Sequence, residues 1–204
     1  MNKAPAAWRD VWSRLGVPEP PGLLTTLIAS YSEPHRAYHN IRHIEECFDA
    51  LAPAAHLAER LAEVHLALWF HDAIYDPRRK DNEQASADFA LDSVIRAGGE
   101  TDSANRIHEL IMVTRHEGPV ENSDARLVAD VDLSILAAPV ARFLEYQSQI
   151  HQEYSWMPED EFQRRRTMIL RGFLERPAIY QTAWFTERLE KAARANIAQE
   201  LGIS

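Results

Sequence analysis

The chain has 204 residues, 46% of them hydrophobic, and a formal net charge of −9 at pH 7. A chain of this length can bury one sizeable core, so we expect one domain over residues 1–204. The acidic balance argues against a nucleic acid polymer or an anionic membrane as partner, because both favour clustered lysine and arginine.

Apolar residues recur with a helical period along nearly the whole chain, and no segment alternates convincingly in the manner of a strand. The sequence therefore predicts an all-α fold. Proline, glycine and Asp/Asn-rich turns separate the helices. In chain order, the predicted helices cover residues 5–15, 23–28, 34–51, 56–75, 82–97, 103–115, 124–137, 139–156, 159–175 and 178–201, the last with a break near Trp184.

The helix predicted over residues 34–51 carries two histidines in the segment YHNIRH. His39 and His43 lie one turn apart on a face that flanks the apolar stripe, where both could point into one cleft. A partly exposed helix edge is the alternative. Cys47, one turn beyond His43, is more typical of a small buried hydrophobic residue than of a ligand.

The helix predicted over residues 56–75 is apolar almost all the way round, so we expect it to run through the core. His71 and Asp72 fall on the same arc as Leu61 and Leu68. An ionised carboxylate without a partner is costly to bury. A divalent cation would satisfy both polar side chains, and a His-Asp pair with internal hydrogen bonds is the alternative.

Two later helices add weaker candidates. Glu83, in the helix predicted over residues 82–97, shares a face with Ala87, which is unfavourable for a carboxylate without a role. We interpret it as a water-positioning base or a group behind the metal, and an acid that stabilises the first helical turn is the alternative. His116, at the end of the helix predicted over residues 103–115, could contact a phosphate or a second metal, although a helix C-terminus by itself favours histidine.

The two acids of the helix predicted over residues 124–137 fall on different faces. Asp132 lies in the apolar arc beside Val128, and we expect it to be buried. Asp130 lies on the polar side with Arg126, so we expect it to be solvated or to lie behind the ligands. Imidazoles and carboxylates without a thiolate suit a borderline or hard divalent cation, for which Mn, Mg, Fe, Ni, Co and Zn are the candidates.

These residues, written H43…H71-D72…D132, resemble the signature of the HD-domain superfamily, which consists of all-helical metal-dependent phosphohydrolases. Most of the chain, including YHNIRHI, FHDAIYD, DNEQASA and DVDLSIL, is similar to a small bacterial family of predicted phosphohydrolases within that superfamily. The resemblance implies an HD-type helical bundle with extra C-terminal helices. It also implies a metal site whose ligands are His43, His71, Asp72 and Asp132.

The segment YHNxxH also resembles the corresponding segment of the cyclic nucleotide phosphodiesterases. That likeness implies that His39 donates a proton to the leaving oxygen while His43 binds the metal. Asp132 would then hold the metal and orient the attacking water. The implied activity is cleavage of a phosphate ester, on a nucleotide or another small phosphorylated metabolite, by a metal-activated water.

A phosphate substrate needs cationic contacts beyond the metal. Lys80, in the loop DPRRKDN after the HD pair, and Arg115 are the candidates for these contacts. Tyr38 adjoins the first motif and is a candidate lining residue. The expected partner is therefore a small-molecule phosphate.

Two other classes of function stay open. Some HD proteins resemble this chain yet use a di-iron centre to oxygenate substrates, and such sites usually contain additional histidines, for which only His108 and His116 are available. The other class is a noncatalytic binding or regulatory module with a structural metal. Closed metal coordination, without an open position for water, would favour that class.

The single cysteine excludes an intramolecular disulfide and a cysteine-rich zinc site, which fits a reducing cytoplasm. The first thirty residues lack the apolar core and small-residue cleavage site of a secretory signal, and no run of about 18 apolar residues occurs. We therefore expect a cytoplasmic protein without a membrane segment. Its oligomeric state stays open, with a homodimer among the options.

Overall fold

The computed structural model describes residues 4–203, and within this range it contains helices and no strand. The prediction of an all-α fold is confirmed. The elements are α1 Ala4–Arg14, α2 Leu23–Ser30, α3 Ile41–Leu51, η1 Ala52–Leu57, α4 Leu61–Phe70, α5 Asn82–Arg96, α6 Thr101–Met112, η2 Val113–Arg115, α7 Ser123–Asp132, η3 Leu133–Ala137, α8 Val140–Glu153, α9 Glu159–Glu175 and α10 Ala183–Glu200, where η marks a 3-10 helix.

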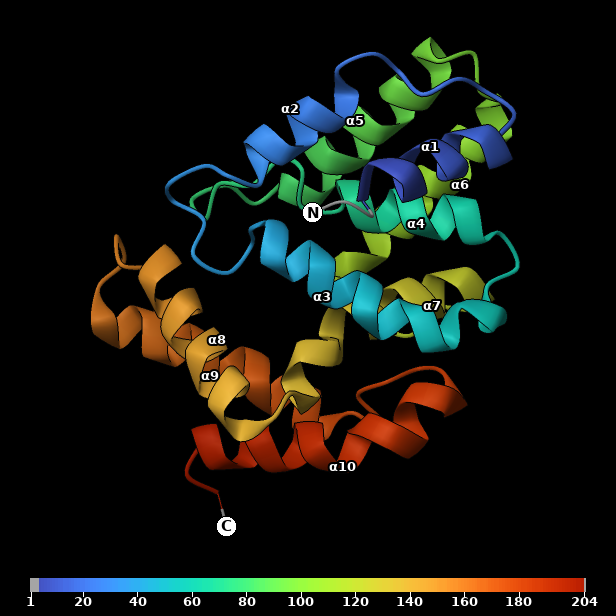
Figure 1. The fold of residues 1–204 in the computed structure, drawn as a ribbon. Coiled ribbons are helices and arrows are strands. Elements are labelled where there is room, and N and C mark those ends of the chain that lie inside the picture. The colour runs from blue at the N-terminus through green and yellow to red at the C-terminus, as the bar shows by residue number, and fades with distance from the viewer. Residues whose placement is uncertain (1–3, 204) are drawn as a thin grey trace.

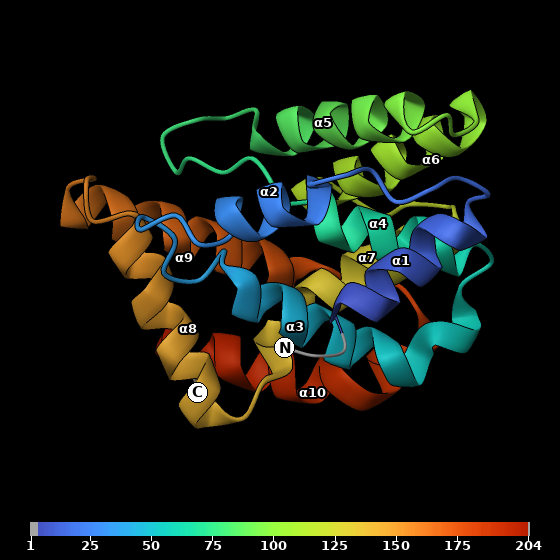
Figure 2. The same cartoon turned by 45° about the horizontal axis from the view of Figure 1, so that its top comes forward.

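Helix α4 occupies the interior of the fold. It packs against α1, α3, α5, α6 and α7, and its residues from Val64 to Phe70 are buried except for His65. Figures 1 and 2 place α5 and α6 on one side of α3 and α4, and α10 on the opposite side. This burial confirms the expectation that the all-apolar helix runs through the core.

The buried hydrophobic residues form one cluster. It extends from Trp8 and Trp12 of α1 to Phe185 and Ile197 of α10. Within residues 4–203, no helix combines the length and the apolar character that a bilayer crossing requires.

The third helix starts later than predicted. It begins at Ile41 because Asn40 has an extended backbone (φ −119°, ψ −175°) and its side chain accepts a hydrogen bond from the backbone N–H of Arg42. An asparagine in this position satisfies a free N–H group of the first helical turn. His39 therefore lies in the turn before α3, and the prediction that His39 and His43 share one helix is wrong.

The fourth helix is shorter than predicted at both ends. Residues 52–57 form η1, with Pro53 in its first turn, and α4 itself begins at Leu61 and ends at Phe70. His71 is the residue that caps the C-terminus of α4, and Asp72 lies in the turn that follows. The HD pair is thus held at a helix end, from which both side chains can turn toward other elements.

Other helix ends also differ from the predicted ones. The helices predicted over residues 103–115 and 124–137 tighten into the 3-10 segments η2 and η3 at Val113 and Leu133. The final helix begins only at Ala183, where Thr182 accepts a hydrogen bond from the backbone N–H of Phe185 as a helix cap. The predicted break near Trp184 is the start of α10.

Candidate metal centre

The tautomer of His71 is set by a carbonyl group of its own helix. The Nδ1 atom lies 2.9 Å from the backbone oxygen of Leu68, which can only accept a hydrogen bond. Nδ1 therefore carries the hydrogen, and the Nε2 atom of the neutral ring presents its lone pair to the interior. A histidine held in this way is ready to bind a metal through Nε2.

Four side chains from three segments converge around that nitrogen. His43 comes from α3, His71 and Asp72 from the end of α4, and Asp132 from the end of α7. The Nε2 atoms of the two histidines lie 3.0 Å apart. Asp72 Oδ2 is 3.0 Å from His71 Nε2 and 3.6 Å from His43 Nε2. Asp132 Oδ1 is 3.2 Å and 3.5 Å from the Nε2 atoms of His43 and His71, respectively.

These separations fit a shared cation. Metal–ligand bonds of about 2.1 Å place neighbouring ligands about 3.0 Å apart in an octahedron and about 3.4 Å apart in a tetrahedron. The five separations between the imidazole and carboxylate donors run from 3.0 to 3.6 Å. The structure thus brings the four predicted ligands close to one another, and three of them, His43, His71 and Asp132, belong to a group that could hold a metal ion.

The electrostatics of the four side chains favour a positive charge at their centre. Burial lowers the pKa of the His71 imidazole, but Asp72 and Asp132 outweigh burial and hold this pKa well above its usual value. Burial raises the pKa of the Asp72 carboxyl, yet His71 and His39 keep it below the usual range. Hydrogen bonds from His116 and His43 likewise keep the pKa of Asp132 well below that range despite its burial. A proton on the His71 imidazole offsets part of the carboxylate charge, and a divalent cation could take its place.

The side chain of Cys47 also adjoins the centre. The residue is 1% exposed, as expected, and its Sγ atom lies 3.7 Å from Nε2 and 3.8 Å from Nδ1 of His43. The sulfur and one donor atom each of His43, His71 and Asp132 all lie within 4.8 Å of one another. The donor set is therefore not free of sulfur, in contrast to the expectation from the sequence.

His116 contacts Asp132, one of the predicted ligands, on the side away from His43 and His71. It ends η2 with a left-handed backbone (φ 54°), and its Nε2 atom lies 2.9 Å from Oδ2 of Asp132. Asp132 thus turns one oxygen to His116 and the other to His43 and His71. Among the two roles predicted for His116, a phosphate contact and a second metal, neither describes this contact, which orients Asp132.

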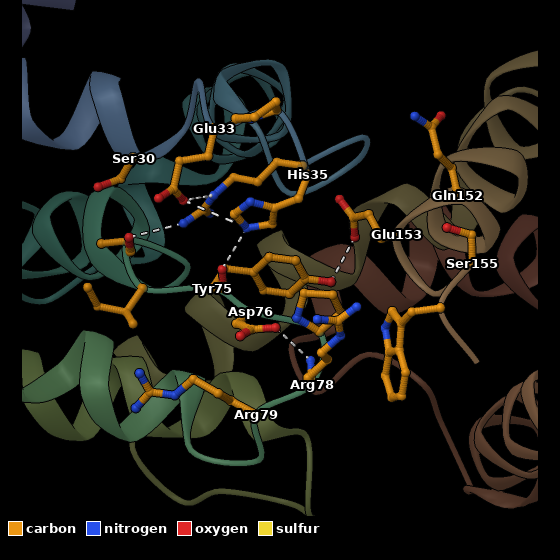
Figure 3. Close-up of a pocket in the computed structure, with 16 residues that line it drawn as sticks. Ser30, Glu33, His35, Tyr75, Asp76, Arg78, Arg79, Gln152, Glu153 and Ser155 are labelled. Carbon is orange, nitrogen blue, oxygen red and sulfur yellow. Dashed lines mark hydrogen bonds and ion pairs between the residues drawn. The ribbon is translucent and has the colours of Figure 1, made fainter.

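His39 is fixed by a carboxylate that the sequence reasoning missed. Its Nδ1 atom lies 2.6 Å from Glu153 Oε2, and the Glu153 carboxylate also accepts hydrogen bonds from the backbone N–H groups of Tyr38 and His39. The hydroxyl of Tyr75 donates a fourth hydrogen bond to it, over 2.7 Å, as Figure 3 shows. The side chain of Glu153 has no exposed surface.

The charges of this pair stabilise each other. Burial lowers the pKa of His39, but Glu153, with Asp72, raises it above its usual value. Burial raises the pKa of Glu153, and His39 outweighs that effect and brings it to about 2. A signal was present in the sequence, because Glu153 continues the helical stripe of Phe143, Tyr146 and Ile150, all of which are buried.

Arg36 joins the two turns that carry site residues. Its guanidinium is buried and donates hydrogen bonds to the backbone oxygens of His39 (3.1 Å), Asp72 (2.6 Å) and Ala73 (3.1 Å). It also pairs with Glu33 at 2.9 Å. The turn before α3 is thereby held against the turn after α4, an arrangement that no local sequence pattern indicated.

A cavity of about 630 Å³ opens beside the candidate centre. The predicted lining and substrate residues all face it: Tyr38, His39, Lys80, Glu83, Arg115 and His116. Asp72 and Asp132 reach the same cavity. The site residues chosen from four separate segments of the sequence are therefore neighbours in space.

Glu83 does not take the buried position that its helix face suggested. Its side chain is 33% exposed, and Oε2 lies 4.0 Å from Nε of Arg115. Lys80 is exposed. Glu83 therefore faces Arg115, a predicted phosphate-binding residue, at the cavity wall. It was expected to be a water-positioning base or a group behind the metal.

Two acids of α7, Asp130 and Asp132, are distributed differently from the expectation. Asp130 is fully buried, and its carboxylate accepts hydrogen bonds from the backbone N–H groups of Gln181 and Thr182, each over 2.7 Å. The prediction that Asp130 is solvated is wrong, because residues 181–182, just before α10, cover the face that a single helix leaves open. Asp132 is partly buried and reaches the site as predicted.

His108 lies apart from the centre. Its Nε2 atom is 3.0 Å from the side-chain nitrogen of Gln84 and 3.1 Å from Asp88 on α5. Of the two histidines available for a di-iron site, only His116 therefore adjoins the four ligands.

A second cavity, of about 730 Å³, lies on the other side of Tyr75. Figure 3 shows its polar lining, including His35, Arg78 and Ser155. The ring of Tyr75 stacks on His39 with centroids 4.2 Å apart, and on the parallel ring of His35 at 6.3 Å. Tyr75 thus separates this cavity from the candidate centre.

Comparison of the chain with models of protein families, with curated proteins and with solved structures gave no match. A function for the chain therefore has to be argued from its residues and their geometry.

Proposed function

We propose that the chain is an HD-type, metal-dependent phosphohydrolase. The observation that carries the proposal is the convergence of His43, His71, Asp72 and Asp132 beside a cavity of about 630 Å³: the two imidazole nitrogens lie 3.0 Å apart and 3.0 to 3.6 Å from the two carboxylates. A cavity of this size suits a small molecule. Five of its wall residues are cationic, namely Arg79, Lys80, Arg115, Arg166 and Arg176.

The four donors would hold one divalent cation. When bound, such a cation lowers the pKa of a coordinated water and polarises the phosphoryl oxygens of an ester. Asp132 is oriented for this role by His116, and His71 by the carbonyl of Leu68. Neighbours that fix the direction of a ligand raise the affinity of a metal site.

His39 is suited to protonate the leaving oxygen. Its Nδ1 atom is bound to Glu153, and within residues 4–203 its Nε2 atom has no hydrogen-bond partner. The raised pKa favours the protonated ring near neutral pH. A departing alkoxide gains from a proton at this position, and the charge of Glu153 stabilises the cationic ring until the proton is transferred.

The substrate class that fits is a phosphate ester of a nucleotide or of another small metabolite. Lys80 and Arg115 would contact the phosphate, with Glu83 holding Arg115 in place. Charge-assisted hydrogen bonds from such groups to phosphate oxygens are stronger than neutral ones. Tyr38, whose ring packs 4.8 Å from that of His43, would close the inner wall.

The test combines metal analysis with a panel of phosphate esters. Purified protein is stripped with a chelator, reloaded with Mn, Mg, Co, Ni or Zn, and assayed on nucleotides and sugar phosphates. We expect metal-dependent hydrolysis that His71→Ala abolishes together with metal binding. His39→Asn should keep the metal and lower kcat about 10²-fold or more, as loss of a general acid does.

His108→Asn is the matched control, because it removes a histidine that lies outside the centre. It should leave both metal content and kcat unchanged. Absence of metal binding and of hydrolysis with every ion would refute the proposal, and so would full turnover by His71→Ala.

A further inference from the structure

The donors of the candidate centre face two different cavities. Asp72 lines the cavity of about 630 Å³ that would admit the substrate. Cys47 instead lines a smaller one, of about 210 Å³, on the α8 side. His43 belongs to the smaller cavity as well, and Asp132 belongs to both. The sulfur thus faces a different cavity from the one that would admit the substrate.

We propose that Cys47 Sγ is a ligand of the same ion and makes the centre select a sulfur-accepting cation such as Zn²⁺, Co²⁺ or Fe²⁺ over Mg²⁺. This inference rests on the proposed metal centre. It adds a donor and a metal preference that the four HD-type ligands do not imply.

The position of the sulfur fits coordination. With bonds of about 2.3 Å to sulfur and about 2.1 Å to nitrogen, a tetrahedral angle places the two donors about 3.6 Å apart. Cys47 Sγ lies 3.7 Å from Nε2 of His43, and the donor atoms of His43, Cys47, His71 and Asp132 all lie within 4.8 Å of one another. A His-Cys-His-Asp set is a donor combination that zinc accepts.

A hydrogen bond to His43 explains the position of the Cys47 sulfur less well than metal coordination does. The two ring nitrogens of His43 lie at nearly the same distance from Sγ, 3.7 and 3.8 Å, so the sulfur is not directed along the lone pair of either one. Tyr38 lines both the small cavity and the larger one, and its hydroxyl is buried and has no hydrogen-bond partner within the described residues. Buried polar groups are generally partnered, so an unpartnered hydroxyl in a wall that Tyr38 shares with Cys47 and His43 points to a polar occupant.

Coordination from this side leaves the substrate side open. The thiol would lose its proton to solvent as the bond between sulfur and metal forms. Thiolate ligands favour zinc and other borderline ions, whereas Mg²⁺ prefers oxygen donors in an octahedron. Because Asp72 and the substrate cavity lie on the other side, a sulfur ligand would not occupy the position that a phosphate needs.

Cobalt provides the test, because the spectrum of Co²⁺ reports its ligands without any assay of activity. The chelated protein is titrated with Co²⁺ and compared with Cys47→Ser, Cys47→Ala and His71→Ala. We expect visible d–d bands together with a near-ultraviolet sulfur-to-cobalt charge-transfer band. Both cysteine variants should keep the d–d bands and lose the charge-transfer band, and His71→Ala should lose both.

The metal preference is measured by competition on the same proteins. Cys47→Ser should weaken Zn²⁺ binding by at least about tenfold, since even the loss of a group behind a ligand costs that much. Its Mg²⁺ affinity should change by less than about twofold, because Mg²⁺ gains little from sulfur.

The outcomes separate this inference from the proposed function. Strong d–d bands without a charge-transfer band in the unaltered protein would overturn the role of Cys47 and leave the metal centre standing. An equal loss of Zn²⁺ and Mg²⁺ affinity in Cys47→Ser would also overturn it. No cobalt binding at all would overturn both proposals. The spectrum of the unaltered protein decides the matter even if a cysteine variant fails to fold.

Discussion

Glu153 combines a buried carboxylate with four hydrogen-bond donors. Two are backbone N–H groups, one is the hydroxyl of Tyr75, and one is the imidazole of His39. Hydrogen bonds and a nearby positive charge both favour the ionised form of a carboxylate. The residue therefore contributes to stability as well as to the orientation of His39.

The stability of the fold should depend on pH through Glu153. Its pKa is about 2 in the fold, below the usual 4.5, so its contribution is present above pH 4.5 and is lost as the pH falls toward 2. At about 1.4 kcal/mol per pKa unit this contribution is about 3 kcal/mol. Glu153→Gln should therefore lower the free energy of unfolding at pH 6, and the gap to the unaltered protein should narrow by about half or more at pH 3.

Denaturant unfolding at the two pH values measures this gap. Glu187→Gln serves as the control, because that side chain is 73% exposed and should give no gap at either pH. A gap of the same size at pH 6 and pH 3 would contradict the assigned role of Glu153.

At the scale of elements, α7 holds the start of two other helices. Asp124 accepts hydrogen bonds from the backbone N–H groups of Glu59 and Arg60, just before α4. Asp130 does the same for Gln181 and Thr182, just before α10. The end of α7 then places Asp132 at the candidate centre. One helix thus connects the N-terminal helices, the C-terminal helices and the site.

Loss of the Asp130 carboxylate should destabilise the fold. Asp130→Ala leaves two backbone N–H groups and the Thr182 hydroxyl without their buried acceptor. We expect a loss of about 3 kcal/mol in the free energy of unfolding, because an unsatisfied buried donor retains its full desolvation cost. Denaturant unfolding measures it, with Asp92→Ala, an exposed acid on α5, as the matched control. Equal stability of the two variants would show that the link from α7 to α10 is not needed.

At the scale of the whole molecule, the candidate centre joins α3, α4 and α7. These three helices are separated in the sequence. At the centre their side chains meet, and Nε2 of His43 lies 3.2 Å from Oδ1 of Asp132. A cation bound to all four residues would connect the three helices in the folded state alone. Binding to the folded state alone raises the free energy of unfolding.

Metal should therefore raise the melting temperature. An ion supplied at about 100 times its Kd adds about 2.7 kcal/mol, which corresponds to about 5 to 10 °C for a chain of this size. Thermal unfolding with and without Mn²⁺ or Zn²⁺, after chelation, measures the shift. His71→Asn should show no shift, and an equal shift in that variant would place the stabilising ion elsewhere.

Two features of this protein could be predicted from the sequence because they depend on helical period and on the chemistry of single residues. The period of apolar residues predicted the all-α fold, which is confirmed. Polar residues within apolar stripes, such as Asp72 and Asp132, indicated the positions that converge at the centre. The helix ends were predicted less accurately. The helical period extends to the N-terminal side of Asn40 and Thr182, but these two residues cap their helices and so make α3 and α10 start later.

Only the tertiary structure decided which groups surround those positions. Glu153 reaches His39 across 114 positions of the chain, and the segment before α10 covers Asp130 although its own helix leaves that face polar. His116 meets Asp132, and Cys47 faces the cavity of about 210 Å³, because of the way α3, η2 and α7 pack. The physical reason is that a helical wheel describes one element, whereas burial and hydrogen bonding depend on the elements that pack against it.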